Sequence, residues 1–398
     1  MKRAALKGVL ALLLLLHCFG ADASSGPAAP SAALERVSRS IVQIGLFSRV
    51  KKAVLRPEAP FVATDQSDGR SHPLPQGRAF EVRASRGGGV RLGDMSLGGI
   101  VRLTPKNPGG SVLVGTRRYR GNLLLKPGEG GTVTVVNELG LEEYLYGVLP
   151  REMSPDWPLE ALKAQAVVAR TWALNNLGKY AELGYDLTDD DRSQVYSGLD
   201  VEDERARRAV RETAGQTLSW KGAPLNVFFH SCCGGHTAPA TAVWGGEEKP
   251  PKPLRGVRDR WCADSPHARW TAYFTDDTIL EALQGRGMMG ARLERIAPGE
   301  RDGSGHLKEI RLRVDGRSFT VRAGDLRSWL GAADIKSSQI WRIVRRRHGW
   351  EFVGRGYGHG VGLCQWGARA MADDAKSYRK ILSHYFPGAD IVVRDELR

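Results

Sequence analysis

The segment PLEALKAQAVVARTWALNNL, residues 158–177, decides the fold class of the C-terminal part of this 398-residue chain. Pro158 suits the first position of a helix because the missing N–H has no partner there in any case. Apolar residues then recur at the 3.6-residue spacing of one helix face, at Leu159, Leu162, Ala166, Ala169, Ala173 and Leu177. The spacing predicts a long helix here, and weaker patterns predict further helices at 201–214 and 367–383.

Runs of β-type residues lie on both sides of this helix and are separated by Gly-Gly and Pro-Gly turns. They cover residues 41–46, 79–83 and 132–136 ahead of the helix, and residues 225–230, 308–321 and 340–353 behind it. The pattern predicts an α+β protein, in which a small β-rich domain at 34–137 precedes a helical core at 138–398 with an inserted β region at about 270–353.

The N-terminus carries the features of a secretory signal peptide. Three basic residues precede an apolar run over 8–16, and the small-x-small sequence ADA follows at 21–23. The run is shorter than the ~18–20 residues that a membrane span needs, so we expect no transmembrane helix in the mature chain. We expect a signal peptide at 1–23, a flexible linker at 24–33, and export to the periplasm or cell envelope. The alternatives are an uncleaved anchor and a lipoprotein acylated on Cys18.

Excess positive charge is the main compositional feature of the chain. The 58 Lys and Arg residues exceed the 44 Asp and Glu residues by 14. This balance favours a polyanionic partner such as nucleic acid, anionic lipid, wall polymer or acidic glycan, and export excludes nucleic acid. We interpret the arginine clusters at 205–208 and 345–347 as solvated faces, and the acidic run at 189–191 as a turn rather than a metal site.

One carboxylate, Glu152, lies in the apolar sequence VLPREM just ahead of the long helix. Desolvation among Leu149 and Trp157 would raise its pKa, which suits a general acid at neutral pH. The alternative is that Glu152 pairs with Arg151 or compensates the positive end of the following helix. The local sequence leaves both interpretations open.

Cysteine and histidine residues gather in FFHSCCGGHT, residues 228–237, and a further cysteine follows at Cys262. In an oxidising exterior, Cys232 or Cys233 could form a disulfide with Cys262, and unpaired thiols are another alternative. A structural zinc ion is the third alternative, and its tetrahedral site would use His230, Cys233, His236 and Cys262. We expect no cofactor for catalysis itself.

The segment GRGYGHGVGLCQWGA, residues 354–368, has glycine at nearly every second position. It contains a string similar to GxGxxG, but no βαβ unit or downstream acid accompanies it, so we do not expect dinucleotide binding. Glycines let the backbone approach a ligand closely. We expect His359 and Gln365 to be the polar groups that this segment presents.

Four ordered motifs resemble those of the stage II sporulation protein D family, over residues from about 40 to 390. They are the block at 142–177, SQVYSG at 193–198, FHS and GGHT at 229–237 followed by WGG at 244–246, and the GxGHGVGxxQWGA block. Characterised members of that family are lytic transglycosylases. They cleave the bond between N-acetylmuramic acid and N-acetylglucosamine without water and leave a 1,6-anhydro sugar.

The resemblance implies roles for individual residues. The catalytic acid/base of the family falls on Glu152, and one such glutamate suffices because the carboxylate that protonates the leaving oxygen can then take the proton of the muramyl 6-hydroxyl. The implied substrate is a glycan strand whose stem peptides an amidase has removed, which leaves free lactyl carboxylates. The motif positions implied to line the glycan cleft are Arg170, Gln194, Tyr196, His230, His359 and Gln365.

The older family label, amidase enhancer, implies a second function. In this alternative the protein is a non-catalytic glycan-binding protein that recruits or stimulates an N-acetylmuramoyl-L-alanine amidase. The chain also departs from similar sequences at Cys364, where a small polar residue is common, and we interpret this thiol as a buried packing group or a reactive group.

Overall fold

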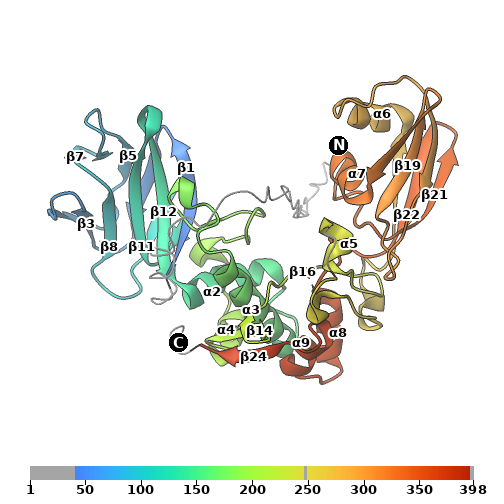
Figure 1. The fold of residues 1–398 in the computed structure, drawn as a ribbon. Helices are drawn as coiled ribbons and strands as arrows, with labels where there is room; N and C mark the ends of the chain where they lie inside the picture. The colour runs from blue at the N-terminus through green and yellow to red at the C-terminus, as the bar shows by residue number, and fades with distance from the viewer. Residues whose placement is uncertain (1–40, 246–248, 395–398) are drawn as a thin grey trace, which may run out of the picture. The chain divides into compact units, whose positions relative to one another are not determined.

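The computed structural model of the protein describes residues 41–245 and 249–394. The expected signal peptide at 1–23, its cleavage site and the linker lie outside the described residues. The chain forms two compact units, and Figure 1 shows helices and several sheets within them. We call residues 41–229 and 368–394 the first unit, and residues 230–245 and 249–367 the second unit. The α+β class is therefore confirmed.

The first unit begins with two β-sheets. The larger sheet has the order β13 (Leu187–Thr188), β1 (Ile41–Val50), β12 (Thr132–Gly140), β11 (Asn122–Gly128), β8 (Val101–Pro105), β3 (Phe61–Asp65) and β4 (Ser71–Leu74). The smaller sheet has the order β10 (Arg117–Tyr119), β9 (Val112–Val114), β2 (Ala53–Pro57), β5 (Phe80–Ala84), β6 (Val90–Leu92) and β7 (Met95–Leu97).

Alternation of apolar and polar residues explains how these strands form a core. Buried and exposed residues alternate along β2, so that one face of the strand packs inside and the other meets solvent. The long strand β12 is buried over most of its length because it lies between β1 and β11 in the middle of the larger sheet. It leads directly into the first helix of the unit, so the sheet positions that helix.

The helices of the first unit surround α3 (Leu159–Asn175), which matches the long helix predicted at 158–177. Its neighbours are α2 (Leu141–Glu152), α4 (Glu204–Glu212), α9 (Tyr378–Tyr385) and strand β14 (Gln216–Trp220). Figure 1 shows the C-terminal strand β24 (Asp390–Val393) beside β14, whose other neighbour is β15 (Ala223–Pro224). Because it is enclosed in this way, α3 buries residues on nearly all sides rather than on the single face that the spacing predicted.

The helix predicted at 367–383 is wrong as one continuous element. The structure has α8 (Gln365–Asp373) and then α9, separated by a sharp turn. Ala375 adopts a left-handed conformation with φ 56°, and the N–H groups of Ala375 and Lys376 bond to the carbonyls of Ala372 and Met371. This is a Schellman termination, which stops a helix even where the residues themselves favour helix.

The second unit is built from short antiparallel sheets and three α-helices. One sheet has the order β17 (Trp270–Thr275), β22 (Gly349–Gly354) and β21 (Ile340–Arg346), and another has the order β18 (Leu293–Pro298), β19 (Glu309–Val314) and β20 (Arg317–Arg322). A two-stranded sheet joins β16 (Phe229–His230) to β23 (Leu363–Cys364). The helices are α5 (Ala240–Trp244), α6 (Asp276–Gln284) and α7 (Ala323–Leu330).

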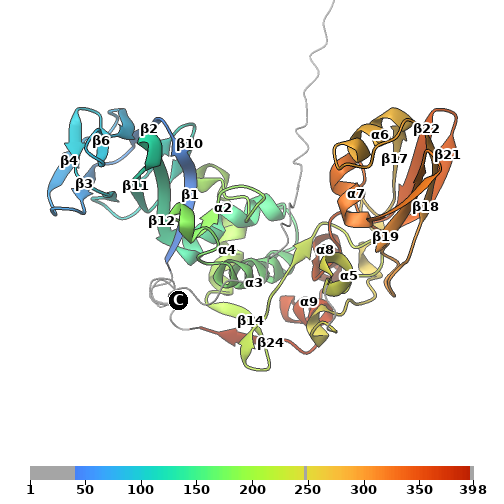
Figure 2. The same ribbon diagram turned by 45° about the horizontal axis from the view of Figure 1, so that its top comes forward.

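Two β-type runs that the sequence predicted differ from the strands of the structure. The run at 308–321 is the hairpin of β19 and β20, which turns at Asp315 and Gly316, both with positive φ. The run at 225–230 contributes only the two residues of β16. Figure 2 shows α6 and α7 beside the sheets, and their apolar residues share one hydrophobic core with the strands.

Among the described residues, no helix is both long enough and apolar enough to cross a membrane.

Candidate functional site

Glu152 is the last residue of α2, in the first unit. Pro150 lies inside the final turn of this helix, and the N–H of Met153 closes the helix by bonding to the carbonyl of Leu149 at 3.0 Å. The carboxyl group is thus attached to a rigid element whose start is fixed by the end of β12. The C-terminal end of a helix carries partial negative charge, which disfavours a carboxylate there.

Burial of the carboxyl group raises the pKa of Glu152 to about 7. A hydrogen bond from the backbone N–H of Val195 and the charge of Arg151 act in the opposite direction and are weaker. The residue nevertheless keeps part of its surface accessible to solvent. The alternative in which Arg151 neutralises Glu152 is therefore not favoured, and the group can hold or release a proton near neutral pH.

Polar side chains from two other segments approach this carboxyl group. The charge of Glu152 contributes to the raised pKa of Tyr144, so the two groups lie within electrostatic reach. The Tyr144 hydroxyl donates a hydrogen bond of 3.3 Å to Oε1 of Gln194, which directly precedes the Val195 N–H that bonds to Glu152. The amide nitrogen Nε2 of Gln194 is buried and has no hydrogen-bond partner among the described residues.

Tyr196 does not line a cleft as the family resemblance implied. Its side chain is 1% exposed, and its hydroxyl donates to Oδ1 of Asn137 at 2.8 Å. Its ring lies 5.3 Å from that of Tyr144 and 5.9 Å from that of Tyr119, measured between centroids. A side chain enclosed in this way supports the walls of the site and cannot contact a glycan.

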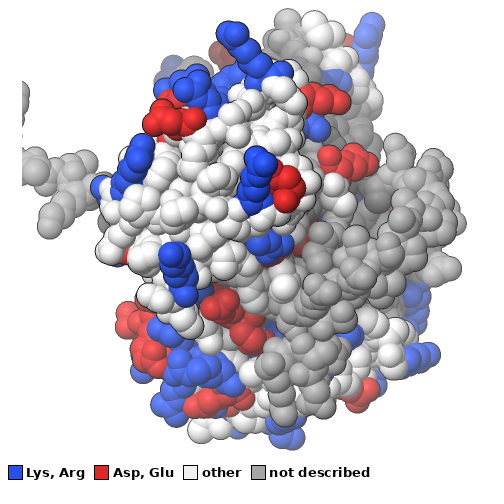
Figure 3. Space-filling model, turned by 90° about the vertical axis from the view of Figure 1, so that its left-hand side faces the viewer, with Lys and Arg blue, Asp and Glu red and all other residues white. Residues whose placement is uncertain are grey.

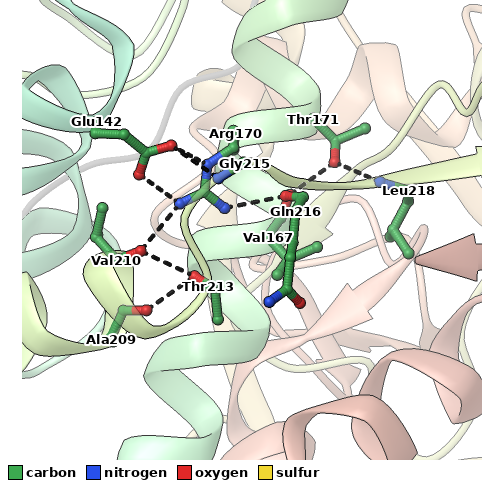
Figure 4. Close-up of polar contacts among 10 residues, drawn as sticks. All are labelled: Glu142, Val167, Arg170, Thr171, Ala209, Val210, Thr213, Gly215, Gln216 and Leu218. Carbon is green, nitrogen blue, oxygen red and sulfur yellow. Dashed lines mark hydrogen bonds and ion pairs between the residues drawn. The ribbon is translucent and has the colours of Figure 1, made fainter. Parts of the chain in front are cut away.

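Arg170 also differs from the expectation that it binds substrate. Figure 4 shows its guanidinium between Glu142 and the backbone of the segment that leads into β14. It donates two hydrogen bonds of 2.6 Å to the Glu142 carboxylate and further bonds to the carbonyls of Gln216 at 3.0 Å and Val210 at 3.3 Å. The side chain has no exposed surface. Arg170 therefore ties α2, α3 and α4 together and is a structural residue.

Asp189 is a further candidate, which no pattern in the sequence indicated. Burial raises its pKa to about 6, although Arg117 lies 3.5 Å from its carboxylate. Its charge also contributes to the raised pKa of Tyr144, as the charge of Glu152 does, so both carboxyl groups act on the same tyrosine. The acidic run does form the turn predicted at 189–191, in which Asp190 accepts hydrogen bonds from Thr188 and Arg192. Only burial, which depends on the fold, distinguishes Asp189 from its neighbours.

The loop that follows Glu152 is held by an arginine of the predicted basic cluster. Arg205 on α4 donates to the carbonyls of Pro155 at 2.8 Å and Trp157 at 2.9 Å, and Arg369 lies over the Trp157 ring. Arg208 is exposed, as expected, and pairs with Glu212 at 2.6 Å. Figure 3 shows one face of the molecule, on which Lys and Arg side chains are interspersed with Asp and Glu. The positive charge on that face is not gathered into one patch.

In the second unit, His230 and His359 lie close together. The ring centroids are 5.5 Å apart, and the His359 ring lies 5.2 Å from that of Trp244. His230 is buried and its Nδ1 donates to the carbonyl of Val361 at 3.1 Å, while burial lowers its pKa to about 4, so the ring is neutral. Gln365 is 6% exposed at the start of α8. The contribution of His230, His359 and Gln365 to glycan binding stays a prediction.

The glycine-rich segment packs against the protein itself. A side chain at Gly360 would approach the His306 ring to 2.6 Å, and one at Gly358 would approach His230 Cβ to 2.8 Å. Both glycines also have positive φ. Close approach is therefore needed here for internal packing. A shallow pocket of about 490 Å³ in this unit is lined in part by His236, Arg301, Trp341 and Arg355, and Arg355 belongs to the glycine-rich segment.

The ligand set predicted for zinc is wrong in part. Neither His230 nor His236 belongs to the group of ligand atoms around Cys233 and Cys262, and the Nδ1 atoms of the two histidines bond to the carbonyls of Val361 and Thr237. Instead, Cys233 and Cys262 lie with Asp259 and Cys364, and all four side chains are buried. The Sγ atoms of Cys233 and Cys262 are 3.5 Å apart, so the structure contains no disulfide between them.

Comparison with known proteins identifies the family of the chain. Residues 129–220 match the family model described as stage II sporulation protein, and residues 260–362 match a domain of unknown function. An uncharacterized protein of Brachyspira hyodysenteriae is 36% identical over 275 residues, which cover 69% of this chain and 72% of that protein. Stage II sporulation protein D of Bacillus subtilis is 30% identical over 277 residues, which cover 65% of this chain and 76% of that protein. The Amidase enhancer of the same bacterium is 25% identical over 290 residues, but only 40% of its length is covered. The matched segment includes Glu152 and the whole of α3, and the chain belongs to the stage II sporulation protein D family.

Proposed function

We propose that this protein is an exported lytic transglycosylase that cleaves the bond between N-acetylmuramic acid and N-acetylglucosamine in peptide-stripped glycan strands. The observation that carries the proposal is the state of Glu152. Its pKa is raised to about 7 by burial, while part of its surface remains accessible. A carboxyl group in this condition is protonated often enough at neutral pH to act as an acid and is basic enough to act next as a base.

The reaction needs two proton transfers, and one carboxyl group can perform both. In the first, protonated Glu152 gives its proton to the glycosidic oxygen, and the bond from that oxygen to C1 of the muramyl sugar breaks. In the second, the Glu152 carboxylate takes the proton of the muramyl 6-hydroxyl as that oxygen bonds to C1. The product is a 1,6-anhydromuramyl end, and no water is consumed. A hydrolase would instead need a second carboxyl group to activate water or attack the sugar.

The groups around Glu152 suit this cycle. The Val195 N–H bonds to the carboxyl group and stabilises the anion that forms after the first transfer. The Nε2 group of Gln194 is a buried donor with no partner among the described residues, so we assign it to a hydroxyl or acetamido oxygen of the glycan. Tyr144 holds the other end of the same amide through its hydroxyl. Gln194 is thus oriented by the fold before substrate binds.

Product analysis tests the proposal. Denuded glycan is digested with the wild type and with Glu152→Gln, and the products are identified by mass spectrometry. We expect 1,6-anhydromuramyl ends from the wild type and none from Glu152→Gln. Glu143→Gln is the matched control, because Glu143 lies on the same helix with 44% of its side chain exposed and should remain near wild-type activity.

Two results would contradict the proposal. One is full activity of Glu152→Gln. The other is a wild-type product with hydrolysed reducing ends, which would indicate a hydrolase and make Asp189, whose pKa is also raised by burial, the candidate second carboxyl group. In that case, Asp189→Asn should abolish hydrolysis.

A second candidate function is favoured by the name of one relative, Amidase enhancer. In this function the protein binds glycan and recruits or stimulates an N-acetylmuramoyl-L-alanine amidase without cleaving the strand. It predicts that glycan pellets with the protein while product masses stay unchanged, and that Glu152→Gln stimulates the amidase as well as the wild type does. The digestion described above separates the two functions.

A further inference from the structure

Four potential metal ligands converge at one buried place in the second unit. They are the Sγ atoms of Cys233, Cys262 and Cys364 and a carboxylate oxygen of Asp259, and all four atoms lie within 4.8 Å of one another. The residues come from three segments of the chain. Cys233 follows β16, Asp259 precedes the short helical turn Trp261–Asp264 that contains Cys262, and Cys364 ends β23.

The distances within this cluster match a tetrahedral zinc site better than a disulfide. With a Zn–S bond of about 2.3 Å, two sulfur ligands of one tetrahedral ion lie about 3.8 Å apart. The Sγ atoms of Cys233 and Cys262 are 3.5 Å apart, and Cys233 Sγ lies 3.1 Å from Oδ2 of Asp259. The side chain of Cys232 also lies against those of Cys262 and Cys364, so a disulfide between any two of these four thiols would leave two thiols and Asp259 buried beside it.

The backbone around the cluster is arranged to stabilise thiolates. The N–H groups of Cys233 and Gly367 point to Cys364 Sγ at 3.3 and 3.4 Å. The N–H of Trp261 donates to Oδ1 of Asp259 at 2.8 Å, which orients that carboxylate and leaves Oδ2 directed at Cys233. Such donors to ligand atoms are a regular feature of metal sites, because they spread the negative charge that the ligands bring.

We propose that Cys233, Asp259, Cys262 and Cys364 bind one structural Zn²⁺ ion. Zinc suits three thiolates and one carboxylate in a closed tetrahedral arrangement, whereas Mg²⁺ and Ca²⁺ favour oxygen ligands. All four ligands come from the protein and are buried, so no position remains for a reacting water, and the role of the ion is structural. The ion fixes the glycine-rich segment, through Cys364, against the turn after β16, and with it the neighbours His230 and Gln365.

Metal analysis of the full mature chain tests the site. The protein is purified without added chelator, and zinc is measured per chain for the wild type, Cys364→Ser and His236→Ala. His236 is the matched control, because its Nδ1 bonds to the carbonyl of Thr237 and it does not belong to the four-ligand group, although the sequence predicted it as a zinc ligand. We expect one zinc ion per chain in the wild type and in His236→Ala, and a loss of at least tenfold in affinity in Cys364→Ser.

X-ray absorption of the wild-type zinc protein keeps the test decisive even if Cys364→Ser does not fold. We expect a first shell of three sulfur atoms and one oxygen or nitrogen atom. A wild-type chain without metal whose mass rises by two hydrogens on reduction would overturn the proposal in favour of a disulfide. A metal-free chain with unpaired thiols, or loss of zinc from His236→Ala to the same extent as from Cys364→Ser, would also overturn it. These outcomes are independent of transglycosylase activity.

Discussion

Replacement of Arg170 by methionine distinguishes a structural role from a substrate-binding role. The side chain donates two hydrogen bonds of 2.6 Å to Glu142 and two more to backbone carbonyls, at 3.0 and 3.3 Å. Methionine keeps most of the buried volume but removes all four bonds and leaves the Glu142 carboxylate, with 20% of its side chain exposed, without its cation. Breaking a buried ion pair from one side costs about 3–5 kcal/mol.

We therefore expect Arg170→Met to lower the free energy of unfolding of the first unit by about 3–5 kcal/mol. Arg170→Lys keeps the charge but not the planar guanidinium group, so it should lower the free energy of unfolding by about 1–3 kcal/mol. Glu142→Gln should lower the free energy of unfolding by a similar amount to Arg170→Met, because it leaves the Arg170 guanidinium buried without an anion. The matched control is Arg208→Met, in an exposed pair with Glu212, where we expect a loss below about 1 kcal/mol.

Hydrogen exchange measured by mass spectrometry suits this chain, since it reports the opening free energy of α3 separately from that of the second unit. Pelleting with denuded glycan is measured on the same samples under conditions where they are folded. The structural assignment predicts faster exchange across α3 and unchanged glycan affinity in the folded fraction. If Arg170→Met lowered the free energy of unfolding by less than about 1 kcal/mol and also weakened glycan binding, the structural role of Arg170 would be refuted.

Three further predictions concern the environment of Glu152. The transglycosylase rate should fall as pH rises above about 7, because the first step needs the protonated acid, and a rate that still increases well above that pH would exclude Glu152 as the acid. Since the pKa of Glu152 is about 7 in the folded chain and 4.5 as its ordinary value, the wild type should lose stability as pH rises from 4.5 through 7. Glu152→Gln should therefore be more stable than the wild type by roughly 3 kcal/mol at pH 8 and no more stable at pH 4. Equal differences at both pH values, in urea unfolding, would show that the carboxyl group is not desolvated. Gly147→Ala should destabilise the first unit by about 1–3 kcal/mol, because the added methyl group would lie 2.6 Å from the Tyr196 ring, and a melting temperature equal to that of the wild type would show that this ring can move.

Local sequence patterns were sufficient for several features of the molecule. The helix at 158–177 and the mixture of helix and strand could be predicted because the spacing of apolar residues along the sequence reflects the periodicity of each element. Glu152 could be singled out because an isolated carboxylate among apolar residues is unusual. The raised pKa that this pattern suggested agrees with its burial in the structure.

Contacts between distant segments could not be predicted in this way. Arg170 and Tyr196 resembled cleft residues by their motif positions, yet each finds a buried partner in another segment, Glu142 and Asn137 respectively. Asp189 resembles any acidic turn residue in the sequence, and only its burial in the fold distinguishes it. The end of α8 was missed because a left-handed residue, rather than proline or glycine, stops the helix.

The sequence by itself determined the fold class, the main helix and the candidate acid Glu152, since each depends on residues close together in the chain. Only the tertiary structure decided which of the other motif residues support the fold and which remain available to a ligand. It also decided which residues make up the cysteine cluster. Cys364 lies next to Cys233 although 131 residues separate them in the sequence, whereas His230 and His236 bond to backbone carbonyls. Spacing cannot specify such a site, because its ligands are brought together by the packing of separate strands and turns.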